Sequence, residues 1–298
     1  MKVLIIGCNG QLGRDLMGQA QARGWEAAGA DLPELDITKA ASVAHIFERC
    51  GAVGAVINSA AYTAVDAAES NAETAFAVNR DGVRILAQTC EQRKAPLIHI
   101  STDYVFDGLK TSPYLPADEI NPMGVYARSK AEGEEELRRH LTRHVIVRTS
   151  WLFGLHGPNF VKTMLRLGKE RDILRVVDDQ VGCPTYAGDL AGALLDIAAY
   201  IQHKSDGWGT YHYCNEVPVT WYAFTRRILA LARTYEQFMV NQIVPILTAH
   251  YPTPAQRPPY SVLDCDSLEA RFGISRRPWE KALREMLSRL YEEQKPEG

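Results

Sequence analysis

Short apolar runs alternate with longer amphipathic segments through the first half of the chain. The runs are rich in β-branched residues and lack polar alternation, which is typical of strands buried on both faces of a parallel sheet. They cover Lys2–Ile6, Trp25–Ala30, Ala55–Asn58, Leu97–Ser101 and Val145–Thr149. Helical periodicity fills the gaps between them, over Leu12–Arg23, Ala40–Arg49, Ala72–Arg93 and Ser129–Arg139. This alternation predicts an α/β fold with a doubly wound parallel sheet and right-handed crossovers.

The pattern loosens after Trp151. Two further strands are expected there, at Leu174–Val177 and Tyr211–Tyr213. The expected helices are Phe160–Lys169, Asp189–Ile201, Trp221 to about Arg233 and Trp279 to about Glu292. Proline interrupts regular structure between Pro245 and Pro259. The second half therefore predicts a smaller lobe built from insertions and the C-terminus.

Composition and charge exclude several classes of function. The 298 residues carry a formal net charge of -3, which favours neither nucleic acid nor an anionic membrane as a partner. The apolar start, Met1 to Ile6, is too short for a signal peptide or a membrane span. Six scattered cysteines form no Cys-x-x-Cys pair, so reduced thiols in a cytoplasm are expected. His140 and His144 have the spacing of a metal pair, but we interpret them as basic residues closing a charged helix.

The first strand runs directly into a glycine-rich turn, Gly7-x-x-Gly10-x-x-Gly13, and then a helix. Such glycines allow a tight turn and close approach of the backbone to a pyrophosphate, which the helix N-terminus then attracts. The position predicts a Rossmann-type sheet. We expect residues 1–150 to form the dinucleotide-binding domain, with part of 170–202 completing its sheet. Residues 151–298 are expected to form mainly a substrate-binding lobe.

Asp31 ends the second expected strand, where an acid can accept hydrogen bonds from the adenosine ribose. The same carboxylate would repel a 2′-phosphate, and Arg14 is the one basic residue close by in the sequence. These residues favour NADH over NADPH, and the competing interpretation of Asp31 is an ordinary solvated acid in a turn.

Tyr126 and Lys130 lie four residues apart, on one face of an expected helix. A lysine cation beside a phenol lowers the pKa of the phenol, which makes it a usable acid or base near neutral pH. Reduction of a ketone needs such a donor, because hydride addition leaves an alkoxide. Thr102 follows the strand at Leu97, at the end of a parallel sheet where ligands bind. These features predict a reductase, whereas each alone is common by chance.

The chain resembles the extended short-chain dehydrogenases and, within them, the dTDP-4-dehydrorhamnose reductase family. The matching stretches span nearly the whole length: Gly7 to Gly13, Asn58 to Asp66, Ser101 to Gly108, Tyr126 to Lys130, Arg148 to Gly154, Asp179 to Thr185, and Arg257-Pro258 before Ser261. The resemblance implies reduction of the C4 ketone of dTDP-6-deoxy-L-lyxo-4-hexulose to dTDP-L-rhamnose.

The resemblance also implies residue roles. Tyr126 is expected to donate the proton, Lys130 to contact the nicotinamide ribose, and Thr102 to bind the ketone oxygen. Asp103 and Trp151 are expected to face the sugar, although core packing is an equal interpretation of Trp151. The cofactor is expected to lie against Gly10, Gln11, Leu12, Asp36, Ile37, Ala61, Tyr62 and Thr63.

Several alternatives stay open at this level. Some members of the family hold Mg²⁺ between protomers, and Asp15, Asp189 and Glu280 fall near the corresponding places, so a homodimer that holds Mg²⁺ is one hypothesis. The substrate could be another dTDP-4-keto-6-deoxy sugar. The chain also resembles a non-catalytic regulatory subunit of methionine adenosyltransferase, although that role needs no proton donor.

Overall fold

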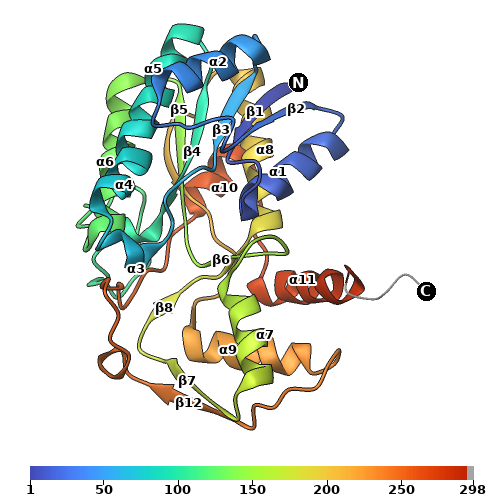
Figure 1. The fold of residues 1–298 in the computed structure, drawn as a ribbon. Helices are drawn as coiled ribbons and strands as arrows, with labels where there is room; N and C mark the ends of the chain where they lie inside the picture. The colour runs from blue at the N-terminus through green and yellow to red at the C-terminus, as the bar shows by residue number, and fades with distance from the viewer. Residues whose placement is uncertain (294–298) are drawn as a thin grey trace.

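A six-stranded parallel sheet is the centre of the molecule (Figure 1). The computed structural model describes residues 1–293. The strand order is β10-β5-β4-β3-β1-β2, so the direction of winding reverses between β1 and β3. Ligands of doubly wound sheets bind at the carboxyl ends of the strands beside such a reversal. The strands are β1 (Lys2–Ile6), β2 (Glu26–Ala30), β3 (Ala55–Asn58), β4 (Leu97–Thr102), β5 (His144–Thr149) and β10 (Gly209–His212).

Helices cover both faces of this sheet, which confirms the predicted fold class. In β1, Val3 and Ile5 pack with α1 and α8, whereas Leu4 and Ile6 pack with α2 and α5. Each of these four side chains is at most 1% exposed, and burial of one such side chain contributes about 1.5–3 kcal/mol. The four helices are α1 (Gln11–Ala22), α2 (Ala40–Cys50), α5 (Val83–Arg93) and α8 (Ala187–Lys204).

The expectation that part of 170–202 completes the sheet needs correction. Its strand, β7 (Ile173–Val177), pairs with β12 (Gln242–Ile246) in a separate two-stranded sheet. β7 exposes Ile173 and Arg175 and buries the residues between and after them, so it has one solvated face, unlike the central strands. The span instead contributes α8 to one face of the sheet, and the sixth central strand is β10.

A second lobe lies beyond the carboxyl ends of the central strands (Figure 1). Its main helices are α7 (Phe160–Glu170), α9 (Trp221–Ala232) and α11 (Trp279–Glu293). They enclose their own core, in which Phe224 and Leu283 are wholly buried. The chain also forms shorter elements, of which α10 packs against β10 and α8. They are α3 (Val65–Ala68), α4 (Ala72–Phe76), β6 (Leu152–Phe153), β8 (Val181–Gly182), β9 (Thr185–Tyr186), β11 (Val219–Thr220) and α10 (Asp266–Phe272).

Two helices near the cleft differ from their predicted bounds. The helix expected over Ala72–Arg93 contains a π-helical turn at Ala77–Gly82, which separates α4 from α5. The helix expected from Ser129 begins earlier, as α6 (Val125–His140), so Tyr126 lies in its first turn.

None of the helices within residues 1–293 is long and apolar enough to cross a membrane.

Candidate active site

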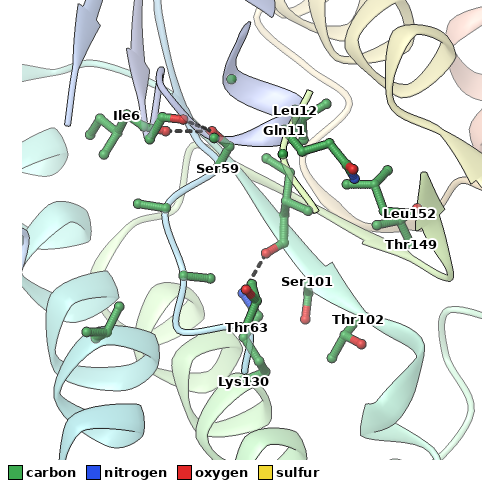
Figure 2. Close-up of a pocket in the computed structure, with 18 of the residues that line it drawn as sticks. Ile6, Gln11, Leu12, Ser59, Thr63, Ser101, Thr102, Lys130, Thr149 and Leu152 are labelled. Carbon is green, nitrogen blue, oxygen red and sulfur yellow. Dashed lines mark hydrogen bonds between the residues drawn. The ribbon is translucent and has the colours of Figure 1, made fainter. Parts of the chain in front are cut away.

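A cavity of about 710 Å³ opens at the carboxyl ends of β1, β3, β4 and β5. This volume lies within the range of small-molecule and cofactor sites. Most of its lining belongs to the sheet domain, and Trp221 reaches it from the second lobe. Every residue predicted for cofactor, catalysis or substrate lines it except Tyr62. Figure 2 shows Thr102 and Lys130 at one end of the cavity, away from Gln11 and Leu12 of the glycine turn.

The glycine turn is closed so tightly that side chains are excluded. Gly7 has a φ of +79°, and a Cβ on Gly13 would lie 2.0 Å from the carbonyl oxygen of Gly7. The helix N-terminus therefore approaches the strand end directly, leaving the backbone of Gly10 and Gln11 open to the cavity. This is the geometry in which backbone N–H groups and the helix dipole attract a phosphate.

Asp31 joins this turn to the end of β2. The backbone N–H of Asn9 donates to Oδ2 of Asp31 over 2.9 Å, and that of Leu32 donates to Oδ1 over 2.8 Å. Asp36 and Ile37 also line the cavity. The carboxylate of Asp36 accepts hydrogen bonds from Thr38, and these bonds lower its pKa. Both acids are thus fixed by neighbouring backbone rather than left as mobile surface groups.

The loop after β3 presents Ala61 and Thr63 to the cavity, but Tyr62 does not line it. The backbone N–H of Tyr62 donates to Oδ1 of Asn79 over 2.9 Å, and Nδ2 of Asn79 donates back to its carbonyl oxygen over 3.1 Å. The same Nδ2 donates to Oγ of Ser129 on α6 over 3.0 Å. Asn79 is therefore a brace between this loop and the helix that carries Tyr126. Asn79 lies in the π-helical turn and belongs to none of the sequence motifs, so the sequence did not predict its role.

Tyr126 and Thr102 meet at the end of β4. Burial raises the pKa of Tyr126 to about 12, and the nearby Thr102 hydroxyl opposes that rise. The expected lowering of this pKa by Lys130 is not found: the pKa is raised, and Lys130 is not among the groups that shift it. Burial also lowers the pKa of Lys130 to about 8, so the amine loses its charge before the phenol ionises. Tyr126 is consequently a protonated phenol at neutral pH, which is the form that can donate a proton.

Lys130 is held by the backbone of β4. Its Nζ donates to the carbonyl oxygen of Ile100 over 2.7 Å and lies 3.4 Å from Nε2 of His99. Nearby, Oγ1 of Thr102 donates to Oδ1 of Asp103 over 3.1 Å. Burial raises the pKa of Asp103 to about 7, so its carboxyl is partly protonated near neutral pH and can then donate a hydrogen bond.

Trp151 and Trp221 form an aromatic wall of the cavity. Their rings stack with centroids 3.4 Å apart and planes 7° apart, and both line the cavity. Trp151 has a φ of +47°, which turns it out of line with β5. A Cβ on Gly182 would come within 2.6 Å of the Trp151 ring, so that glycine makes room for it. The sequence predicted Trp151 but missed Trp221, which lies 70 residues further along and enters by tertiary packing.

Two of the three acids considered for Mg²⁺ have other partners. Asp189 accepts from Nη2 of Arg277 over 2.7 Å, and Glu280 lies 2.7 Å from Nη2 of Arg227. Burial raises the pKa of Asp15, the third of these acids. Across residues 1–293, no group of three or more His, Cys, Asp or Glu side chains is arranged to hold a metal ion.

The two histidines with metal-pair spacing do not share a helix. His140 is the last residue of α6 and lies 3.3 Å from Glu136, whereas His144 is the first residue of β5. The interpretation that both residues close a helix is therefore wrong for His144.

Comparison with known proteins places the chain in a family. The family model of the RmlD substrate binding domain matches residues 1–292. A dTDP-4-dehydrorhamnose reductase from Aggregatibacter actinomycetemcomitans is 44% identical over 286 residues, 95% of this chain and 97% of that protein. The solved dTDP-4-dehydrorhamnose reductase from Clostridium acetobutylicum has a TM-score of 0.90 and 39% identity. The one from Bacillus anthracis, in complex with NADP, has a TM-score of 0.88 and 36% identity. Both comparisons cover 97% of this chain and 99% of the other. The chain therefore belongs to the RmlD substrate binding domain family, that of the dTDP-4-dehydrorhamnose reductases.

Proposed function

We propose that this protein reduces the C4 ketone of dTDP-6-deoxy-L-lyxo-4-hexulose to give dTDP-L-rhamnose, with a nicotinamide dinucleotide as the hydride donor. The observation that carries the proposal is the meeting of Tyr126 and Thr102 in one cavity with a glycine turn shaped for a pyrophosphate. Membership of the reductase family supports the same reaction.

The residues of the chain supply binding and proton transfer. The dinucleotide, when bound, supplies the hydride that adds to the ketone carbon. Tyr126, protonated at neutral pH, donates its phenolic proton to the alkoxide oxygen that hydride addition leaves. Thr102 offers a second hydroxyl to the same oxygen, and Lys130 lies against the strand end beside them.

The dinucleotide has a fitting set of contacts in the cavity. The glycine turn and the N-terminus of α1 suit the pyrophosphate, and Asp31 lies where the adenosine ribose would be held. Asp31 favours NADH, because its carboxylate opposes a 2′-phosphate, whereas the NADP complex of the Bacillus anthracis relative favours NADPH. We propose that both cofactors bind and that Asp31 shifts the balance toward NADH.

The sugar end of the cavity is defined by Asp103, Trp151 and Trp221. A partly protonated carboxyl can both donate to and accept from sugar hydroxyls, and the stacked indoles offer an apolar face to a deoxysugar ring.

The experiment is an assay of cofactor oxidation with the dTDP-linked 4-keto sugar, followed by identification of the product by NMR. In Tyr126→Phe, the turnover number is expected to fall by about 10²–10⁴-fold, whereas cofactor binding is retained. Unchanged turnover would remove Tyr126 from the mechanism. Cofactor binding without any turnover in the wild type would favour the regulatory-subunit alternative, and a different product would favour another sugar.

A further inference from the structure

His99 on β4 is a wholly buried histidine whose two ring nitrogens both face polar groups. Its Nδ1 lies 3.1 Å from Nδ2 of Asn58 on β3. Its Nε2 lies 3.4 Å from Nζ of Lys130 on α6. The ring thus bridges the neighbouring strand and the lysine of the proposed catalytic pair.

The direction of these hydrogen bonds is fixed from one end. The backbone N–H of Ala60 can only donate, and it lies 3.1 Å from the side chain of Asn58, so the atom that faces it must be the amide oxygen Oδ1. Nδ2 of Asn58 must then face His99 and donate to Nδ1. Because a neutral imidazole carries one hydrogen, that hydrogen lies on Nε2 and is directed at Lys130.

The Nε2–H of His99 interacts favourably with only one protonation state of Lys130. An ammonium group has only donors, so it meets the Nε2–H of His99 as donor against donor. A neutral amine has a lone pair and can accept that hydrogen. The carbonyl oxygen of Ile100, 2.7 Å from Nζ, accepts from the lysine in either form.

We propose that Asn58 and His99 are positioning residues that present an N–H donor to Lys130 and thereby stabilise its neutral amine. Their effect on catalysis rests on the function proposed above, whereas the hydrogen-bond direction itself does not. In the reduction, Tyr126 gives its phenolic proton to the alkoxide and becomes a phenolate. Lys130 gives a proton to that phenolate more readily when the resulting neutral amine can accept a hydrogen bond from His99.

The surrounding charges are consistent with this role. Glu134, one helical turn after Lys130, favours the charged amine, but Arg148 on β5 neutralises that carboxylate through two hydrogen bonds. His144, also on β5, is the remaining titratable group acting on His99, and its pKa is itself lowered by burial. Burial and the charge of Lys130 together lower the pKa of His99, so its ring stays neutral.

The first test uses the wild-type protein and does not depend on activity. Long-range ¹H–¹⁵N spectra of uniformly labelled protein distinguish the histidine tautomers, and His99→Phe assigns the signal. We expect His99 to be neutral with hydrogen on Nε2 near neutral pH. Hydrogen on Nδ1, or a charged ring, would overturn the proposal even if the protein is an active reductase.

The second test reverses the direction of the hydrogen bonds that run from residue 58 through His99 to Lys130. In Asn58→Asp, a carboxylate would accept from Nδ1, so Nε2 would become an acceptor that favours the charged lysine. The pKa of Lys130, followed by the ¹³Cε shift and assigned with Lys130→Met, is expected to rise by about one pH unit or more. In His99→Phe, the same Asp substitution should produce less than about half that rise, because its charge acts alone.

Equal rises in both backgrounds would show a purely Coulombic effect and overturn the proposal. If Asn58→Asp does not fold, the wild-type tautomer decides the matter. If the wild-type protein shows the expected His99 tautomer but no turnover of the dTDP-linked ketone, the proposed reaction is wrong and the hydrogen-bond direction stands. The two failures are therefore distinguishable.

Discussion

Arg148 on β5 donates two hydrogen bonds to the carboxylate of Glu134 on α6, from Nε to Oε1 over 2.9 Å and from Nη2 to Oε2 over 2.7 Å. Both side chains are almost completely buried, at 2% and 0% exposure. The pair fixes α6 against the central sheet one turn beyond Lys130. The helix that carries the proposed proton donor is therefore anchored by a buried ion pair.

Glu134→Gln is expected to lower the free energy of unfolding by about 3–5 kcal/mol, because it leaves the Arg148 charge buried without its partner. Urea unfolding measures this loss. Glu135→Gln is the matched control: Glu135 is the next residue on the helix, and its ion pair with Arg139 is exposed, so its loss should cost about 0–1 kcal/mol. Similar small losses in both variants would contradict a structural role for the buried pair.

The same pair gives a pH dependence with a definite sign. The pKa of Glu134 is lowered to about 2 in the folded protein, against about 4.3 in an unfolded chain. Its stabilisation is therefore present above about pH 4.3 and is lost as the pH falls toward 2. The stability difference between wild type and Glu134→Gln should shrink over that interval.

Gly13→Ala should abolish high-affinity cofactor binding, since its Cβ would lie 2.0 Å from the carbonyl oxygen of Gly7 and would force the turn open. Quenching of protein fluorescence by NADH measures the loss. Gly18→Ala lies in the same helix, where nothing is within 4 Å of the new Cβ. That control should bind normally and gain about 0.5–1 kcal/mol of stability. Normal binding by Gly13→Ala would mean that the turn is not the cofactor site.

Asp31→Asn should raise the ratio of NADPH to NADH activity by about tenfold, because it removes the charge that opposes a 2′-phosphate. Initial rates with the two cofactors measure the ratio. Glu34→Gln tests whether any nearby acid has this effect, since Glu34 pairs with Arg49 and does not line the cavity. An unchanged ratio in Asp31→Asn, or an equal change in Glu34→Gln, would remove Asp31 as the discriminating group.

Trp221→Ala should raise the KM for the nucleotide sugar by about tenfold or more, with little change in cofactor affinity, because it removes half of the aromatic wall. Steady-state kinetics with each substrate varied separate the two effects. Trp25→Ala removes an indole that packs against the sheet core instead and does not line the cavity, so its KM should stay unchanged. A matching rise in both variants would indicate general loosening.

Local motifs predicted the site better than they predicted its assembly. The glycine turn and the Tyr126–Lys130 spacing are short-range patterns, so their residues could be named from the sequence alone. Trp221 and Asn79 reach the site through tertiary packing, for which no local pattern exists. The pKa of Tyr126 was misjudged for a related reason: helical spacing indicates proximity to Lys130, but not the burial that dominates.

The strands illustrate the same limit. Parallel partners are joined by long crossovers, so a strand's sequence does not say which neighbour it will pair with. The segments that became β7 and β10 were both expected to be strands, yet only β10 joined the central sheet.

Because β10 lies at Gly209–His212, the first half of this chain lacks one edge strand of the central sheet. A fragment ending at residue 150 would leave β5 as a bare sheet edge and would strip α8 from the apolar face formed by Val3 and Ile5. During synthesis, the central sheet is therefore completed only about 60 residues after residue 150, when β10 has been made.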